Sequence, residues 1–130
     1  MLKMILILLV LTSSIMSLDW VKDIETALTL AKKENKNVMV MVEGENCRWC
    51  QKMKHRTLSD ENVEKRLKKF VIVKVMREDE NAMKHLPEVK GVPTVFFMTA
   101  EKKVIEEVIG YFDVLDFTSY IGDVEKKVAK

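Results

Sequence analysis

Hydrophobic residues follow two different spacings along this chain, and the spacings predict which segments are strands and which are helices. Short runs that are apolar or nearly so, as in strands buried within a sheet, lie at 38–42, 70–76, 95–98 and 104–109. Hydrophobic residues spaced three and four apart predict amphipathic helices over 19–36 and 114–128. Shorter helices are expected at 47–58, at 59–69 with Ser59 as the N-cap, and at 81–86 before Pro87.

The order of these segments predicts a single α/β domain. Helices separate the strands at 38–42 and 70–76, which implies parallel crossover connections. A short turn joins the last two strands, which implies an antiparallel hairpin. We therefore expect a central mixed four-stranded sheet with helices on both faces. No repeat, linker or low-complexity tract interrupts the sequence.

Residues 1–17 differ from the rest of the chain and predict an export signal. One lysine precedes an unbroken apolar run at 4–11 and then small polar residues, which is the order of regions in a secretory signal peptide. The run is shorter than the roughly 20 apolar residues of a transmembrane helix, and it lacks the polar face of a core helix. Cleavage after Ser17, cleavage after Ser14 and retention as an anchor all fit this pattern. The remaining domain, 18–130, is then expected outside the cytosol, in a bacterial periplasm.

Composition narrows the class of protein further. The 130 residues, 48% hydrophobic and 32% charged, suit one small folded domain and exclude a collagen-like or wholly disordered chain. A net charge of +2 argues against nucleic-acid binding through bulk charge. Two cysteines are too few for the disulfide framework of a tiny secreted scaffold.

These two cysteines form a Cys-x-x-Cys motif, Cys47-Arg48-Trp49-Cys50, between a predicted strand and a predicted helix. At a helix N-terminus the Cys47 thiolate is stabilised by unpaired backbone N–H groups and the helix dipole, and Arg48 adds a neighbouring cation. Cys47 is therefore the candidate nucleophile, and Cys50, one turn later, the thiol that resolves a mixed disulfide. Trp49 offers a flat apolar surface to a partner's peptide chain.

Other roles for the cysteine pair are less well supported. A structural disulfide that closes so short a loop adds little stability. A metal site built from Cys47, Cys50 and His55 stays open as an alternative, although structural zinc usually takes four protein ligands. Haem attachment is excluded because Gln51, and not histidine, follows the motif. His55 itself is expected to be a solvated surface residue, and redox chemistry needs no cofactor beyond the Cys47–Cys50 disulfide.

Several segments of the chain, among them the Cys-x-x-Cys motif, resemble thioredoxin-fold proteins. They are Trp20, the stretch 27–42, the motif with Lys52 and Met53 after it, the segment LSDENV at 58–63, Gly91-Val92-Pro93-Thr94 and Gly110. Together they extend over nearly all of 18–130. The chain therefore resembles the thioredoxin-like superfamily, and within it the exported thiol-disulfide oxidoreductases.

The resemblance implies a substrate groove and a set of partners. In that family Pro93 would follow a cis peptide bond and lie against the cysteine pair, while the Val92 backbone would pair with an extended substrate segment. The substrates would be cysteine-containing exported proteins, a membrane electron-transfer partner could reduce the protein, and the chain would be a monomer. Reductase or isomerase duty is preferred to oxidase duty, because the chain lacks the inserted helical domain of strong periplasmic oxidants.

One position departs from the family pattern. Thioredoxins usually carry a buried acid six residues before the first cysteine, where this chain has Met41. Glu43 and Glu45 lie nearby in the sequence but are expected to point toward solvent. The missing acid favours, as the alternative function, a non-catalytic thioredoxin-fold module that holds a metal ion or a client protein through the cysteine pair.

Overall fold

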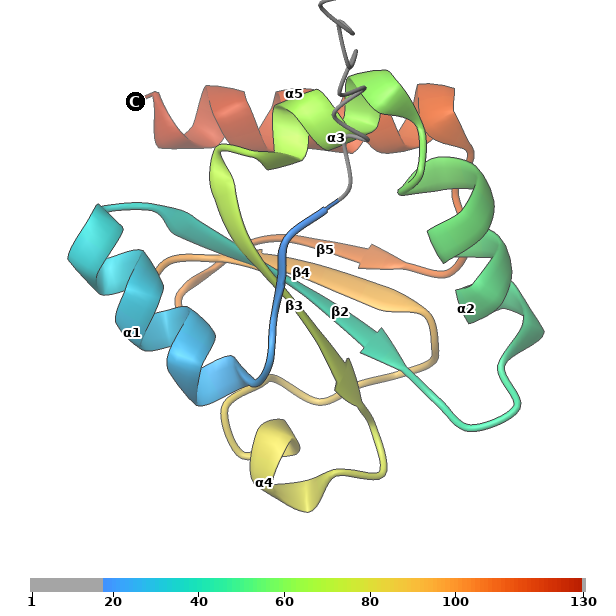
Figure 1. Ribbon diagram of the computed structural model, residues 1–130, viewed down its shortest axis with the longest axis horizontal. Helices are drawn as coiled ribbons and strands as arrows, with labels where there is room; N and C mark the ends of the chain where they lie inside the picture. Colours follow the sequence, from blue (N-terminus) through green and yellow to red (C-terminus); the bar gives the residue numbers. More distant parts are fainter. Residues whose placement is uncertain (1–17, 130) are drawn as a thin grey trace, which may run out of the picture.

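Within residues 18–129, which the computed structural model describes, five strands form one mixed sheet with helices on both faces (Figure 1). The α/β class expected from the sequence is thereby confirmed, whereas the predicted leader 1–17 lies outside the described residues. The strand order is β1-β3-β2-β4-β5, with β1 (Trp20–Val21), β2 (Asn37–Glu43), β3 (Phe70–Met76), β4 (Thr94–Met98) and β5 (Val104–Ile109). β1 and β2 run parallel to β3, β4 is antiparallel to β2, and β5 is antiparallel to β4.

The strand missing from the sequence prediction is β1, at one edge of the sheet. Trp20 pairs with Ile72 and Val21 with Val73, so these residues extend the sheet and do not begin a helix, as the spacing had suggested. Helix α1 (Ile24–Glu34) begins later because the Asp23 carboxylate caps it, accepting a hydrogen bond of 2.8 Å from the Thr26 backbone N–H.

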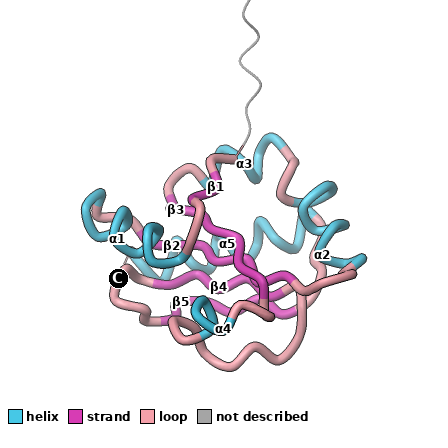
Figure 2. Tube along the Cα trace, turned by 60° about the horizontal axis from the view of Figure 1, so that its bottom comes forward, coloured by secondary structure: helices cyan, strands magenta, loops and turns pink. Residues whose placement is uncertain are grey.

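Alternate side chains of β2 enter two hydrophobic clusters, one on each face of the sheet. Val38, Val40 and Val42 lie in the cluster beneath α1 and α4 (Glu80–Met83). Met39 and Met41 lie in the other cluster, which also holds residues of α2 (Arg48–Lys52), the π-helix η1 (Met53–Thr57), α3 (Glu61–Leu67) and α5 (Val114–Val128). Figure 2 shows the helices on either side of the strands. The face of Met39 and Met41 therefore carries the helix that contains the cysteines.

Helix α3 begins one residue later than the sequence predicted. Asp60, and not Ser59, is the N-cap: its carboxylate accepts hydrogen bonds from the backbone N–H groups of Asn62 and Val63, at 2.9 and 3.0 Å. The Ser59 hydroxyl instead donates to the backbone carbonyl of His55 and so closes the preceding turn. Two adjacent residues that can both cap a helix made the start ambiguous from composition alone.

The helical segment after the cysteines changes its winding. The sequence predicted one helix over 47–58, but α2 is followed directly by η1, in which the Leu58 N–H donates to the Met53 carbonyl at 2.9 Å. This wider turn places Met53, Thr57 and Leu58 together in the interior. The Thr57 hydroxyl also donates to the Phe112 carbonyl at 2.6 Å, which ties the segment to the loop before α5.

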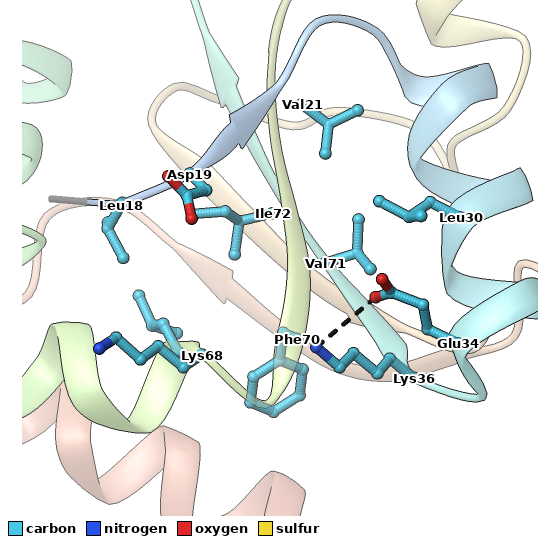
Figure 3. A pocket seen from close by; sticks show the side chains of 11 residues that line it. Leu18, Asp19, Val21, Leu30, Glu34, Lys36, Lys68, Phe70, Val71 and Ile72 are labelled. Atoms are coloured by element: carbon cyan, nitrogen blue, oxygen red, sulfur yellow. Dashed lines mark ion pairs between the residues drawn. The ribbon is translucent and has the colours of Figure 1, made fainter.

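A cavity of about 250 Å³ lies at the β1 edge of the sheet (Figure 3). Leu18, Val21, Leu30 and Phe70 contribute apolar walls, and an ion pair of 3.5 Å between Lys36 and Glu34 lies at its rim. Neither cysteine lines it. No helix in the described part of the chain is long and apolar enough to cross a membrane.

Candidate functional site

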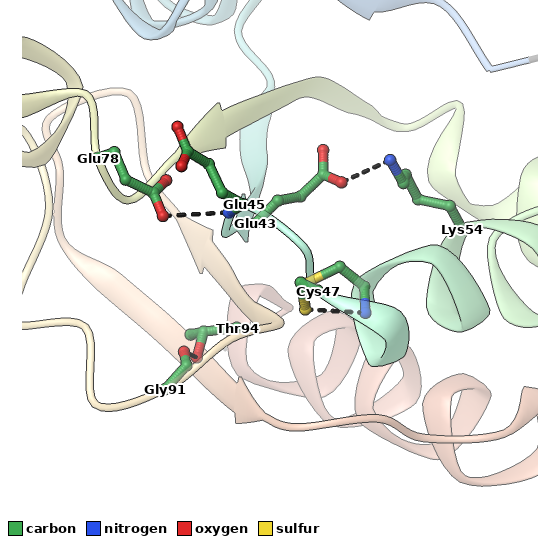
Figure 4. The surroundings of a disulfide bond; sticks show 8 residues. Glu43, Glu45, Cys47, Lys54, Glu78, Gly91 and Thr94 are labelled. Carbon is green, nitrogen blue, oxygen red and sulfur yellow. Dashed lines mark hydrogen bonds and ion pairs between the residues drawn. A yellow bond between two sulfur atoms is a disulfide. The ribbon is translucent and has the colours of Figure 1, made fainter.

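The two cysteines lie where β2 gives way to α2, joined by a disulfide with a Cα–Cα distance of 5.2 Å (Figure 4). Cys47 is the N-cap of α2, and its sulfur accepts a hydrogen bond of 3.1 Å from the Cys50 backbone N–H. The two residues differ in access: Cys50 is fully buried, whereas Cys47 is partly exposed. A partner in solution can therefore reach Cys47 more readily than Cys50.

The loop before β4 supplies a second part of the site. The Val92–Pro93 peptide bond is cis, Pro93 is buried and Val92 is partly exposed. The Pro93 carbonyl accepts a hydrogen bond of 2.8 Å from the Gly110 N–H, at the end of the neighbouring strand β5. Gly44 approaches this loop so closely that a Cβ there would lie 3.1 Å from the Val92 Cγ2 atom. The loop of Pro93 and the segment leading to Cys47 therefore pack against each other.

Glu43 is buried beside the cysteines, contrary to the expectation that it faces solvent. It is the only charged side chain within residues 18–129 that is buried, with 7% of the residue exposed. Its carboxylate forms an ion pair of 2.5 Å with the ammonium of Lys54, drawn near Cys47 in Figure 4. The alternation of β2 predicts this orientation, because residues 39, 41 and 43 share one face of the sheet. Lys54 lies four residues after Cys50, which is one helical turn.

The other acidic residue expected at solvent, Glu45, is exposed. Its backbone N–H donates a hydrogen bond of 3.1 Å to the Glu78 carboxylate in the loop after β3. This hydrogen bond lowers the pKa of Glu78 below its ordinary value, because it stabilises the ionised form. Arg48, the first residue of α2, is exposed.

Trp49 meets two residues, Lys52 and Tyr111, that the sequence did not assign to the site. Half of Trp49 is exposed, and its ring lies 5.6 Å from the ring of Tyr111, centroid to centroid, with the planes tilted by 42°. The Lys52 ammonium lies 4.4 Å from the centroid of the Trp49 ring and 5.8 Å from that of Tyr111. Lys52 follows Trp49 by three residues, a spacing that predicts contact on a helix, but no local signal links Tyr111 to Trp49.

His55 does not join the cysteines in a ligand set. It is exposed on η1, and the part of the chain that the structure describes contains no group of three or more His, Cys, Asp and Glu residues arranged to hold a metal ion. The C-x2-C-x4-H arrangement considered from the sequence is therefore not assembled in this disulfide-bonded form. His85 lies elsewhere, 3.4 Å from the Glu25 carboxylate.

Comparison with known proteins supports the family resemblance. The profile of the thioredoxin-like family matches residues 19–100, which is more than half of the chain. The chain is also similar to the solution structure of a thioredoxin from Thermus thermophilus, with 27% identity and a TM-score of 0.72, covering 85% of this chain and 89% of that one. A structure of the DsbH oxidoreductase shares the fold, with 21% identity, a TM-score of 0.70 and 85% of each chain covered.

Among curated proteins, the chain is similar to Anterior gradient protein 3 of two vertebrates. It is 28% identical to the mouse protein over 98 residues, which is 73% of this chain and 58% of that protein. It is 30% identical to the Xenopus tropicalis protein over 104 residues, 78% of this chain and 62% of that protein. The chain thus spans about three fifths of the length of the curated relatives that it matches.

Proposed function

Because the chain belongs to the thioredoxin-like family, we propose that it is an exported thiol-disulfide oxidoreductase in which Cys47 attacks the substrate and Cys50 resolves the mixed disulfide. The observation that carries this proposal is the unequal exposure of the two cysteine residues. Cys50 is fully buried, whereas Cys47 is partly exposed at the N-cap of α2. An accessible nucleophile next to a shielded partner is the arrangement that two-step thiol–disulfide exchange needs.

In the reducing direction the reaction has two steps. The Cys47 thiolate attacks one sulfur of a substrate disulfide, so that a mixed disulfide forms and the other substrate sulfur leaves as a thiolate. The Cys50 thiol then gives up its proton, which the leaving substrate thiolate takes up, and the Cys50 sulfur attacks the Cys47 sulfur and releases that second substrate sulfur. Two electrons pass to the substrate, and the Cys47–Cys50 disulfide remains. The backbone N–H of Cys50, which contacts the Cys47 sulfur at 3.1 Å, stabilises negative charge there.

The surroundings of the pair suit an extended substrate segment. In this proposal Val92 and Pro93 form one wall of a groove, and the Val92 backbone pairs with the substrate chain. Half-exposed Trp49 supplies apolar surface next to Cys47. Exposed Arg48 adds positive charge that stabilises a thiolate at Cys47.

The proposed setting is outside the cytosol, with residues 1–17 directing export. The support is the order of charged, apolar and small polar residues in that segment. The substrates would be exported proteins with cysteines, and a membrane electron-transfer partner would return the oxidised protein to its dithiol form. We place the protein on the reducing side, because the described domain carries no inserted helical domain between its strands.

Single cysteine variants test the assignment of roles. Reduced Cys50→Ser should accumulate a mixed disulfide with a disulfide-bonded substrate such as insulin, seen as a band that disappears on reduction. Cys47→Ser should form none and should lose all turnover. A mixed disulfide that forms in Cys47→Ser, or forms equally in the two variants, would rule out this mechanism.

The reduction potential of the pair tests the direction. Equilibration against glutathione should give a value near −270 mV, as in thioredoxin, for a reductase. A value near −120 mV would identify an oxidant instead. If no reversible disulfide forms, the binding-module alternative replaces the proposal.

A further inference from the structure

Three side chains from two separate segments meet beside the cysteine pair. Trp49 and Lys52 come from α2, and Tyr111 follows Gly110 in the loop between β5 and α5. The two rings lie 5.6 Å apart, and the Lys52 ammonium lies over the Trp49 ring at 4.4 Å. Because Trp49 stands between the two cysteines in the sequence, a substrate that reaches Cys47 must pass close to this group. We call these three side chains the Trp49 platform.

The platform offers apolar surface that the fold itself does not cover. Half of Trp49 is exposed, while Tyr111 supports it from the side and packs against the core cluster of the same sheet face. Aromatic rings that are held in place lose little conformational entropy on binding, so they suit contact with a peptide chain. Trp49 is thus a pre-arranged contact surface beside the reactive sulfur.

The positive charge of Lys52 on the platform has no ion-pair partner within residues 18–129. Arg48 likewise forms no ion pair with a carboxylate in this part of the chain, whereas Lys54, two residues after Lys52, is paired with Glu43. An ammonium above an aromatic ring keeps N–H donors for a further acceptor, and a carboxylate is the strongest acceptor that a peptide can bring. Apolar surface with an adjacent free cation therefore complements a segment that carries an acidic side chain.

From this complementarity, and resting on the proposed exchange activity, we infer that the Trp49 platform selects extended substrate segments with an acidic residue next to the reacting cysteine. Lys52 is the residue that determines this specificity, and Trp49 and Tyr111 hold its ammonium in place. The contact forms with the substrate chain and not with the sulfurs, so it changes the preference among substrates. Because Lys52 is partly exposed, the effect is of the size of an exposed ion pair.

Three disulfide-linked peptide dimers that differ only in the residue after cysteine test this inference: Asp, Asn or Lys. The second-order rate constant of the reduced protein is measured for each peptide by stopped flow. Each value is divided by that of 2-mercaptoethanol, whose only charge is the reacting thiolate, with the same peptide, which removes the effect of the neighbouring charge on the intrinsic reactivity of the disulfide. We expect the Asp peptide to exceed the Asn peptide by about threefold. The ratio should fall toward one at about 1 M salt, where the screening length is about 3 Å.

Lys52 variants then identify the source of the preference. In Lys52→Gln the Asp-to-Asn ratio should fall to one, and in Lys52→Arg it should persist. Lys32→Gln removes an exposed positive charge on the opposite face of the sheet and should leave the ratio unchanged. A ratio of one in the wild type, a preference for the Lys peptide, or an Asp preference that survives in Lys52→Gln would each overturn the inference.

The same measurements separate this inference from the proposed function. If the wild type reduces the Asn peptide and Cys47→Ser does not, the exchange activity stands whatever the Asp-to-Asn ratio. If the wild type reduces none of the three peptides, the exchange activity fails, and the inference about the platform fails with it.

Discussion

Removing the Lys54 ammonium should destabilise this protein far more than removing an ordinary surface lysine. Lys54→Met keeps the aliphatic part of the side chain but leaves the Glu43 carboxylate without its partner. The Glu43 side chain is only 10% exposed and that of Lys54 is 22% exposed, so neither charge is well solvated by water. A carboxylate left alone in this position must bear the cost of desolvation without compensation.

The expected magnitude lies between two limits. Breaking a fully buried ion pair costs about 3–5 kcal/mol, whereas exposed pairs contribute about 0–1 kcal/mol. Because this pair is mostly but not completely buried, we expect Lys54→Met to lower the free energy of unfolding by about 2–3 kcal/mol. Glu43→Gln should cost less, about 1 kcal/mol, since the longer Lys54 side chain can turn its ammonium toward solvent.

A double-mutant cycle on the oxidised protein measures the coupling directly. Urea unfolding is followed for the wild type, both single variants and Glu43→Gln/Lys54→Met, with Lys69→Met as the control, because Lys69 is exposed. The double variant should be more stable than Lys54→Met alone, since no unpaired charge is then buried, so the coupling energy should exceed the cost of Glu43→Gln and reach about 2 kcal/mol. A coupling energy near zero, or a Lys54→Met variant as stable as Lys69→Met, would refute the reasoning.

Three further changes test the supports of the fold. Hydrogen bonds from Thr26 lower the pKa of Asp23 below its ordinary value of 3.8. In urea unfolding, the stability that the wild type gains over Asp23→Ala should therefore be complete above pH 3.8 and disappear as the pH falls below that value. A difference in stability that does not change with pH would contradict this. Thr57→Val removes the hydroxyl that donates to the Phe112 carbonyl at 2.6 Å, and should cost about 1–2 kcal/mol in the same assay. In Gly110→Ala the added Cβ meets no neighbouring atom, but the residue keeps a φ of +97°, which alanine adopts only with strain, so the free energy of unfolding should fall by about 1–2 kcal/mol. An unchanged urea midpoint would show that the loop relaxes.

Regular elements with a strong local pattern were predictable from the sequence. The strands at 70–76 and 104–109 and the helix at 114–128 occur with the predicted bounds, because continuous apolar runs and regular three-four spacing are local signals. β1 was missed because its two residues gain strand geometry only by pairing with β3, some fifty residues later in the chain. The π-helix η1 was also missed, and its Thr57 hydroxyl donates to the carbonyl of Phe112, a contact that no local pattern records.

In the candidate site, too, some features were predictable from the sequence and others were not. The cysteine pair and its place at a helix N-terminus follow from local spacing, and the structure has Cys47 as the N-cap of α2. The burial of Glu43 was also within reach of the sequence, since it shares its strand face with Met39 and Met41. The composition of the segment 43–46 suggested a turn and obscured that alternation. The contact between Tyr111 and Trp49 could not be predicted from the sequence, because only the packing of the loop after β5 places Tyr111 against Trp49.

Gly110 links two parts of the proposed site. Its N–H holds the Pro93 carbonyl at 2.8 Å, and the next residue, Tyr111, contacts Trp49. The positive φ of Gly110 turns the chain between these two contacts, a conformation that glycine adopts without strain. One loop position therefore connects the wall formed by Val92 and Pro93 with the aromatic surface beside Cys47. For this reason the Cys-x-x-Cys motif alone does not define the proposed substrate surface, and three segments far apart in the sequence must fold together to form it.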